Sequence, residues 1–421
     1  MSIFIKNAKY NNQLLDIAID NGKIIALGKA EGNFDKVIDA KGLHLLPAFV
    51  DIHTHLREPG FTKKEDIKSG AMAAIKGGFA SICCMPNTNP VADCEMVISY
   101  ILNKAKQANM AKVFPIGAIT KGLEGSILAE IGKMKEAGAV AISDDGRPVQ
   151  NANIMRLAME YAKPFDIKIA SHCEDLDLLN GGVCNEGETA TKLGLRGTTR
   201  ASEEVMLSRE IILANTLNTS VHICHVSTKN GVAILRDAKA RGIKVTAETC
   251  PHYFSADDSL LEGFNTMAKV NPPLREKEDV EAIIKGLQDG SIDAIATDHA
   301  PHTYEDKNTE FDLAANGISG IETAFALAYT KLVKTGKISL EQLSKLMTEN
   351  PANIMNIPYG KIEIGGLADL VLVDLDNKYN IDASKFVSKG KNTPFDKWEV
   401  FGKVDTVIVE GQLKLQKGEF V

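Results

Sequence analysis

The fold is decided by the stretch of residues 50–60, Val50-Asp51-Ile52-His53-Thr54-His55-Leu56-Arg57-Glu58-Pro59-Gly60. An apolar run at residues 45–50 predicts a buried strand, and a Pro-Gly turn ends the stretch. Because side chains two apart on a strand point to the same face, His53 and His55 would project together where the strand ends. Two such imidazoles suit one metal ion. The alternative is that His53 and His55 are two polar residues at a strand end without a shared function. The positions of the other histidines and aspartates help to decide between a metal site and this alternative.

Strand-like and helical patterns alternate through the middle of the chain. The apolar runs that predict strands are residues 45–54, 80–85, 113–119, 140–143, 167–171, 220–225, 243–249 and 294–297. Helical periodicity separates most of them, at residues 64–76, 94–108, 127–137, 152–162, 202–215, 231–241 and 280–288, and two further helices follow at residues 321–332 and 339–347. This alternation predicts an α/β fold, a parallel (β/α)8 TIM barrel over residues 49–361. Residues 181–199 and the polar segment 304–312 are its least regular parts, and we expect the second to act as a lid.

Short apolar runs with turn signals occupy both ends of the chain. Near the start, Asp20-Asn21-Gly22 separates two such runs, which is the pattern of a β-hairpin. Near the end, residues 370–375, 404–409 and 413–415 read in the same way. Neither set is large enough to form a stable sheet alone. We therefore expect residues 1–48 and 362–421 to combine into one small β-sandwich domain.

Composition and charge narrow the class of protein. The chain has 421 residues, of which 44% are hydrophobic and 24% charged, as in ordinary globular proteins. A net charge of −7 gives no electrostatic reason to expect nucleic acid or an anionic membrane as partner. There is no apolar run long enough to span a bilayer, and the first residues read as a strand instead of a signal peptide. The 7 cysteines are scattered without a Cys-x-x-Cys pair, which favours a cytoplasmic protein with reduced thiols.

The other histidines and aspartates fall at predicted strand ends. Strand four ends in Asp144-Asp145, strand five in His172, strand six in His225 and strand eight in Asp298. In (β/α)8 barrels the chemistry sits at these C-terminal strand ends, so the side chains would converge on one mouth. A polar residue without a special function could explain any one of these positions. It explains poorly why so many histidines and aspartates fall at strand ends. Imidazoles and carboxylates without thiolates suit Zn²⁺, or less specifically Mn²⁺ and Co²⁺, and the set is large enough for two ions that activate a nucleophile and polarise a carbonyl.

Several longer motifs lie at the same strand ends and in the loops beside them. They are Asp51-Ile52-His53-Thr54-His55-Leu56-Arg57-Glu58-Pro59-Gly60, Met85-Pro86-Asn87-Thr88, Ser143-Asp144-Asp145-Gly146, Ser171-His172-Cys173-Glu174-Asp175, Cys224-His225-Val226-Ser227-Thr228, Val270-Asn271-Pro272-Pro273-Leu274-Arg275, Ala296-Thr297-Asp298-His299-Ala300-Pro301-His302 and Lys389-Gly390-Lys391-Asn392-Thr393-Pro394-Phe395. With these motifs the sequence resembles the dihydroorotases of the amidohydrolase superfamily, and among them the longer bacterial type. The resemblance extends over nearly the whole chain.

The resemblance implies a set of metal ligands for one or two Zn²⁺ per chain. They are His53, His55 and Asp298 for the first ion and His172 and His225 for the second. Many relatives bridge the ions with a carboxylated lysine after strand four, where this chain has Asp144-Asp145. Members of the longer type use the second aspartate, so Asp145 is the expected bridge and Asp144 the alternative.

The implied reaction is the reversible hydrolysis of (S)-dihydroorotate to N-carbamoyl-L-aspartate, a step of pyrimidine synthesis. Arg57 follows His55 by two residues, so strand alternation would place it on the same face, and a guanidinium can bind the substrate carboxylate bidentately. An ion pair with Glu58 is the alternative role for Arg57. Asp298 is the expected catalytic acid and base, taking a proton from the attacking water and delivering it to the departing nitrogen. The further substrate contacts implied by the resemblance are Asn87, Asn271, His302 and Gly317, and His299 is a candidate to steady Asp298.

Two other readings compete with this one. Allantoinases and hydantoinases share the barrel and the metal site but usually retain the lysine, so its absence argues against them, as do Arg57 and Asn87. A non-catalytic dihydroorotase-like partner of aspartate transcarbamoylase would typically have lost metal ligands, whereas every expected ligand is present here. A homodimer and an association with aspartate transcarbamoylase are both compatible with the resemblance, and the residues decide neither.

Overall fold

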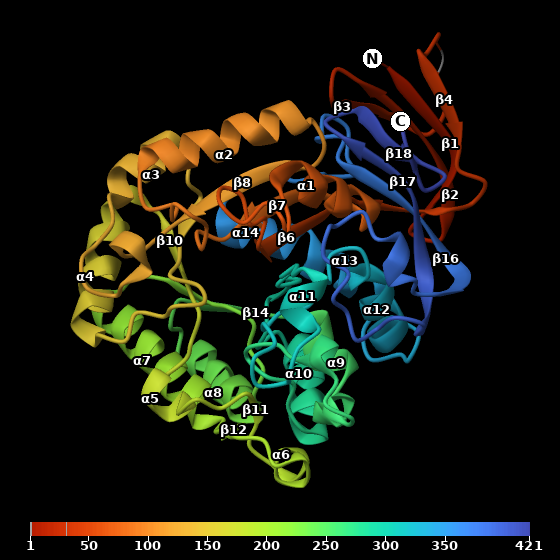
Figure 1. Ribbon diagram of the computed structural model, residues 1–421. Coiled ribbons are helices and arrows are strands. Elements are labelled where there is room, and N and C mark those ends of the chain that lie inside the picture. Colours follow the sequence, from red (N-terminus) through yellow and green to blue (C-terminus); the bar gives the residue numbers. More distant parts are fainter. Residues whose placement is uncertain (1, 31) are drawn as a thin grey trace.

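A computed structural model describes residues 2–30 and 32–421. Parallel strands form an 8-stranded sheet in the order β6-β7-β8-β9-β10-β13-β14-β15 (Figure 1). Their bounds are β6 Phe49–Thr54, β7 Phe79–Cys84, β8 Lys112–Gly117, β9 Ala141–Ile142, β10 Lys168–Ser171, β13 Val221–Ile223, β14 Val245–Thr249 and β15 Ala294–Ile295. A parallel bridge between Thr54 and His299 joins the first strand to the segment after the last and closes the sheet. The predicted (β/α)8 barrel is therefore confirmed.

Helices cover the outside of the barrel (Figure 1). Their bounds are α1 Ile67–Lys76, α2 Glu95–Ala108, α3 Ile131–Ala137, α4 Ala152–Ala162, α7 Ala201–Leu217, α8 Lys229–Ala240, α10 Lys277–Asp289, α12 Ala324–Ala328 and α13 Leu340–Met347. Helix α14 Glu349–Met355 instead packs in a separate core cluster with Val50 and Ile52 of β6. Helix α1 shows why these segments become helical. The Asp66 carboxylate accepts from the backbone N–H of Ser69 and caps its start, and Gly78 at φ 88° follows its end. Between them, Ala71, Ala74 and other small apolar residues are buried against the barrel.

The two ends of the chain form a second sheet, which has 9 strands. Its members are β1 Ile3–Tyr10, β2 Gln13–Asp20, β3 Lys23–Leu27, β4 Lys36–Asp39, β5 His44–Pro47, β16 Leu370–Asn380, β17 Glu399–Val409, β18 Gln412–Gln416 and β19 Glu419–Phe420. Antiparallel pairing of β5 with β16, for example Leu46 opposite Val371, joins the N-terminal and C-terminal halves. In Figure 1 the red and blue strands accordingly lie side by side, near both termini. The expected combination of the two chain ends into one sheet domain is confirmed, and its bounds of 1–48 and 362–421 stay a prediction.

The segment 45–54, expected as one strand, is divided between the two sheets. Residues up to Pro47 belong to β5 in the terminal sheet, and β6 begins at Phe49 in the barrel. At the junction the backbone N–H of Ala48 donates to the carbonyl of Asp369, 2.9 Å away. An uninterrupted apolar run gives no sign of this division, because both sheets bury their share of it.

Both segments expected to be irregular contain regular structure. Residues 181–199 include β11 Cys184–Asn185, α6 Glu188–Leu193 and β12 Gly197–Thr198, and the segment 304–312 begins with α11 Tyr304–Lys307. Helix α11 has a capping box between Thr303 and Asp306. Nζ of the buried Lys307 donates to the carbonyls of Lys269, Ala315 and Gly317 at 3.0, 2.7 and 3.1 Å. These contacts come from residues outside the short helix, which is why local sequence patterns did not predict it.

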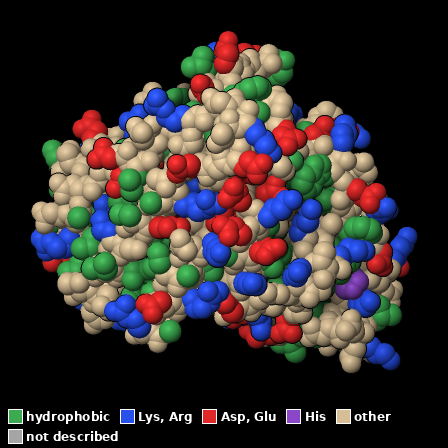
Figure 2. Space-filling view, turned by 90° about the horizontal axis from the view of Figure 1, so that it is seen from below, with side chains coloured by type: hydrophobic (Ala, Val, Ile, Leu, Met, Phe, Trp, Pro, Cys, Tyr) green, Lys and Arg blue, Asp and Glu red, His purple; other side chains and the backbone are tan. Residues whose placement is uncertain are grey.

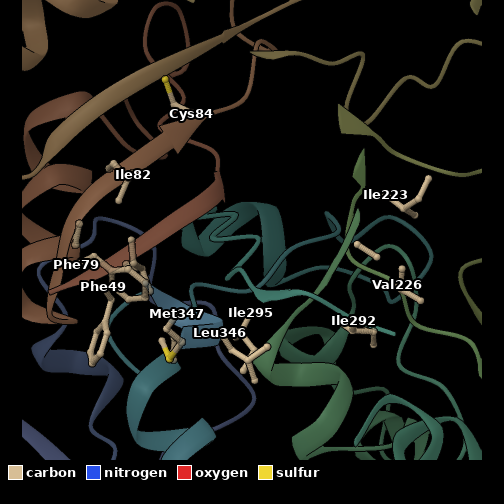
Figure 3. Close-up of a cluster of buried hydrophobic side chains, with 14 of the residues drawn as sticks. Phe49, Phe79, Ile82, Cys84, Ile223, Val226, Ile292, Ile295, Leu346 and Met347 are labelled. Atoms are coloured by element: carbon tan, nitrogen blue, oxygen red, sulfur yellow. The ribbon is translucent and has the colours of Figure 1, made fainter. Parts of the chain in front are cut away.

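A continuous core between the barrel wall and its helices fixes the strand that carries the His-x-His motif (Figure 3). Phe49 at the start of β6 packs edge-on against Phe79 of β7, with ring centroids 5.5 Å apart, and stacks on Phe325 of α12 at 4.8 Å. Leu346 and Met347 of α13 belong to the same core. Rigid packing at the start of β6 holds its other end, where His53 lies, in a defined position.

The outer surface carries charges of both signs. Figure 2 shows acidic and basic side chains interspersed over the face seen from below. Among the described residues, no helix combines the length and the apolar character needed to cross a membrane.

Candidate metal centre and substrate site

The carboxylate of Asp145 lies among four imidazoles at the C-terminal ends of the barrel strands. Oδ1 of Asp145 is 3.4 Å from Nε2 of His53, from Nδ1 of His172 and from Nε2 of His225. Oδ2 is 3.4 Å from Nε2 of His55. All of these side chains are buried. The fold thus brings together residues from β6 and from the segments that follow β9, β10 and β13.

Asp298 completes this cluster from the segment after β15. Its Oδ1 lies 3.0 Å from Nε2 of His55 and 3.6 Å from Nε2 of His53. The backbone of Asp298 is left-handed, at φ 46°, a conformation that non-glycine residues rarely adopt and that concentrates at functional sites. The buried carboxylate of Asp51 holds the neighbouring Thr297 in place, accepting from its backbone N–H at 3.0 Å and from its hydroxyl at 2.5 Å. Because Thr297 is covalently joined to Asp298, these hydrogen bonds from Thr297 to Asp51 also hold Asp298 in position.

This donor set fits a metal centre. Nε2 of His53 and Oδ1 of Asp145 are buried and have no hydrogen-bond partner within the described part of the chain, although buried polar atoms are normally satisfied. Ligand atoms of His53, His55 and Asp298 all lie within 4.8 Å of one another, as do those of His53, Asp145 and His225. Imidazole and carboxylate donors without thiolate match the preference of zinc for nitrogen and oxygen ligands.

Second partners orient the imidazoles of the His-x-His motif. Nδ1 of His53 is 2.7 Å from Oε1 of Glu248, and Nδ1 of His55 is 2.9 Å from Oδ1 of Asn87. Because carboxylate and amide oxygens accept hydrogen bonds, each Nδ1 carries a proton, and Nε2 is the nitrogen that faces Asp145 and would bind a metal ion. The other oxygen of Glu248 lies 3.2 Å from Nε2 of His222, which is also buried.

The electrostatics of the cluster keep its carboxylates ionised. Burial alone would raise the pKa of Asp145, but the surrounding imidazoles of His53, His172 and His225 hold that pKa well below its usual range. Burial opposes ionisation of Asp298 as well, and hydrogen bonding to His55 together with the neighbouring imidazoles lowers its pKa. Both groups are therefore in the form that can bind a cation.

Asp144 faces away from the imidazoles. Its Oδ1 accepts from the backbone N–H groups of Ile119 and Thr120 at 2.7 and 3.0 Å, and the hydroxyl of Thr120 donates to its Oδ2. Burial raises the pKa of Asp144 to about 6. Of the two adjacent aspartates, Asp145 is the one that lies within the cluster.

Arg57 lies beside the cluster, next to His302. Strand β6 ends at Thr54 and the backbone of Arg57 is left-handed, at φ 61°, so a turn sets its position instead of the strand alternation that we expected. Nε of Arg57 donates to the carbonyl of Pro301 at 3.3 Å, and Nη2 lies 3.3 Å from Nε2 of His302. The carboxylate of Glu58, the alternative partner, instead accepts from Ile67 N–H at 2.9 Å and from the hydroxyl of Tyr100 at 2.8 Å.

His302 is held by residues on several sides. Its Nε2 lies 2.8 Å from the carbonyl of Asn316, and its backbone N–H donates to Oδ1 of Asn392 at 2.9 Å. Burial and the charges of Arg57 and nearby lysines lower the pKa of His302 to about 3, so the ring is neutral. Gly317, at φ 144°, packs against this ring, and a Cβ there would lie 3.0 Å from its Cδ2. Only glycine fits both the backbone angle and the space.

Asn271 and His299 each lie against a buried carboxylate. Nδ2 of Asn271 donates to Oε1 of Glu174 at 2.9 Å, and Oε2 of Glu174 lies 3.5 Å from Nε2 of His172. Asn271 is thus connected to the metal cluster through Glu174. The ring of His299 faces Glu65, with Nε2 3.5 Å from Oε2, and its carbonyl accepts from the backbone N–H of His55 at 2.8 Å.

Comparison with known proteins identifies the family. Residues 42–231 match a family model described as Dihydro-orotase-like. The chain is 51% identical to the dihydroorotase of Ruminiclostridium cellulolyticum over 99% of both chains, and 51% identical to that of Acetivibrio thermocellus over 96% of both chains. The chain belongs to the dihydroorotase family. It is therefore a cyclic amidohydrolase, as the sequence motifs predicted.

Solved structures similar to this dihydroorotase come from related amidohydrolases. The L-hydantoinase (dihydropyrimidinase) from Arthrobacter aurescens superposes with a TM-score of 0.90 at 26% identity, covering 100% of this chain and 97% of that chain. A D-hydantoinase superposes with a TM-score of 0.86 at 24% identity, which shows the shared fold. This chain thus shares its barrel and terminal sheet with hydantoinases. Side chains at the C-terminal ends of the barrel strands must therefore determine which substrate is bound.

Four residues of the site were not predicted from the sequence, although the sequence around three of them indicates a role in the site. Asp51 precedes His53 by two residues, so it belongs to the same strand face. Glu248 lies next to the C-terminal end of the predicted strand 243–249, the end at which the chemistry of a barrel sits. Asn392 lies in the motif of residues 389–395, and its Nδ2 donates to the carbonyls of Ala300 and Gly317, both at 3.0 Å. Only His222 looks like an ordinary strand residue.

Proposed function

We propose that this enzyme hydrolyses (S)-dihydroorotate reversibly to N-carbamoyl-L-aspartate with one or two zinc ions per chain. The observation that carries the proposal is the Asp145 carboxylate among four imidazoles, with Asp298 beside it. The residues that would hold the metals are His53, His55 and Asp298 for one ion, His172 and His225 for the other, and Asp145 for both. Bound zinc would lower the pKa of the attacking water and polarise the amide carbonyl.

Arg57 and His302 form the proposed carboxylate site. A backbone carbonyl can only accept, so the 2.8 Å contact with Asn316 places a proton on Nε2 of His302. Nε2–H of His302 and Nη2 of Arg57 are then two donors 3.3 Å apart that cannot satisfy each other. A carboxylate oxygen can accept from Nη2 of Arg57, and also from Nε2–H of His302 if it shares that hydrogen with the carbonyl of Asn316. Asn87 supports the same site, because His55 uses its amide oxygen and leaves its amide nitrogen to donate.

Asp298 is the proposed proton carrier. Its carboxylate is ionised, lies against His55 and belongs to a segment fixed through Asp51. In hydrolysis it would accept a proton from the attacking water and return it to the ring nitrogen as the amide bond breaks. Asn271 and the backbone at Gly317 are the proposed contacts to the ring. In ring closure the same groups would act in the reverse order.

Turnover by the purified enzyme tests this proposal. We expect about one to two zinc ions per chain by elemental analysis, loss of activity on chelation and its recovery on adding zinc. Dihydroorotate should be the preferred substrate, and hydantoin and allantoin should be poor ones. A metal-free preparation with full activity, or faster turnover of hydantoin, would contradict the assignment. A cytoplasmic location, a homodimer and an association with aspartate transcarbamoylase stay predictions, to be tested by fractionation and sedimentation.

A further inference from the structure

Lys64, in the segment between β6 and α1, contacts His302 of the proposed carboxylate site. Its Nζ lies 3.3 Å from Nδ1 of His302 and 3.2 Å from Oδ2 of Asp306. The side chain is 28% exposed, so it is neither buried in the core nor free on the surface. The proposed reaction does not involve Lys64. An ion pair with Asp306 alone would not require contact with the imidazole of His302.

The contact with Lys64 decides which nitrogen of His302 carries the proton. An ammonium group can only donate hydrogen bonds, so Nδ1 of His302 must be the acceptor. Independently, the carbonyl of Asn316 requires a proton on Nε2. Both partners favour the same neutral tautomer, and in that tautomer Nε2–H is the donor next to Arg57. Without Lys64 the ring would lose one of the two contacts that select this tautomer.

Lys64 also adds positive charge to the site. Its ammonium has three hydrogens, and the contacts with His302 and Asp306 account for two of them. The third can donate to an anion bound against His302. A carboxylate there would meet a guanidinium, an ammonium and an N–H of a neutral imidazole, whereas a neutral ring without a carboxylate would use none of these donors.

We propose that Lys64 is a specificity-determining residue, which fixes His302 as an Nε2–H donor and places a second positive charge beside His302, the residue proposed to bind the substrate carboxylate. The enzyme would thereby favour carboxylated cyclic amides over neutral ones. This inference rests on the proposed function of Arg57 and His302. Lys64 acts on binding, and it has no part in the proton transfer assigned to Asp298.

The experiment compares Lys64→Met with Lys63→Met, a matched control at an adjacent exposed lysine. The probes are orotate, a planar ring with the same carboxylate, in equilibrium binding, and dihydroorotate and dihydrouracil in turnover. For Lys64→Met we expect orotate affinity to fall and KM for dihydroorotate to rise by about 10-fold to 100-fold, the effect of losing a charge-assisted hydrogen bond. The kcat should stay within about threefold of wild type, because the interaction is made with the ground state as well.

Metal content and turnover of dihydrouracil separate this role from a structural one. Both should match the Lys63→Met control, because a neutral ring does not use Lys64. Unchanged orotate binding in Lys64→Met, or an equal loss for dihydroorotate and dihydrouracil, would overturn the inference. If the wild-type enzyme fails to turn over dihydroorotate, the proposed function itself is wrong, and orotate binding by the same variants still decides whether Lys64 recognises a carboxylate.

Discussion

Nδ1 of His53 and Oε1 of Glu248 lie 2.7 Å apart in the closed interior of the barrel. Although burial opposes its ionisation, hydrogen bonds from His222 and His53 lower the pKa of Glu248 to about 2. The ionised carboxylate fixes the proton of His53 on Nδ1 and directs the lone pair of Nε2 toward the proposed metals. The His-x-His motif supplies the type of ligand, and this contact selects the nitrogen that binds.

Replacing Glu248 with glutamine tests this relationship. Glu248→Gln keeps the shape and an acceptor oxygen but removes the negative charge, so zinc affinity should fall by about 10-fold to 100-fold. Competition with a chelator on metal-depleted enzyme measures that affinity directly. Glu281→Gln, at an exposed position of α10, is the control and should bind zinc like the wild type. Equal affinities in the two variants would show that the carboxylate does not tune His53.

The two adjacent aspartates should respond differently to alanine. Asp145→Ala should lose metal and most activity, because its carboxylate lies among the four imidazoles. Asp144→Ala should keep its metal but lose about 2–3 kcal/mol of stability, since the donors at Ile119 and Thr120 would lose their acceptor. Elemental analysis and chemical denaturation measure the two effects. The reverse pattern would move the proposed bridge to Asp144.

Arg57→Lys should weaken substrate binding even though the charge is kept. A lysine cannot reproduce the planar guanidinium, so kcat/KM for dihydroorotate should fall by about 2–3 kcal/mol, mostly through KM. Arg241→Lys, on the exposed end of α8, is the matched control and should behave like the wild type. Wild-type kinetics in Arg57→Lys would place the substrate carboxylate elsewhere.

Asp298→Asn separates metal binding from proton transfer. The amide keeps one ligating oxygen but cannot carry the proton, so metal should largely remain while turnover falls by about 10²-fold to 10⁴-fold. In the wild type, hydrolysis should increase with pH through about 7, because the attacking water beside zinc must lose a proton. Ring closure needs that proton and should increase as pH falls. A variant that keeps its metal and more than about a tenth of the activity would exclude Asp298 as proton carrier.

The segment 304–312 should be less accessible when a ligand is bound. Lys307 ties this segment to the carbonyls of Ala315 and Gly317, next to the proposed ring contact. We expect orotate to slow proteolysis in the wild type, and Lys307→Met to be cleaved faster because those buried carbonyls lose their donor. Lys285→Met, at an exposed position, is the control. Identical cleavage with and without orotate would argue against a lid.

The sequence by itself determined the class of fold and the chemistry of the mouth. Alternating strand and helix patterns require a parallel sheet covered by helices, and the C-terminal strand ends of such a sheet meet on one side. The sequence therefore predicted that His53, His172 and Asp298 lie close together. The motifs around them were specific enough to indicate the family, which the relatives then confirmed.

The tertiary structure decided what depends on contacts between distant segments. It divided the run 45–54 between two sheets, gave α11 its helical turn, and placed Asp145 but not Asp144 among the imidazoles. Periodicity shows which face of a strand a side chain occupies, but adjacent residues beyond a strand end follow backbone angles that periodicity does not encode. For the same reason the partners Glu248 and Lys64 could not be paired with their histidines from sequence: hydrogen bonds across hundreds of residues exist only once the barrel has closed.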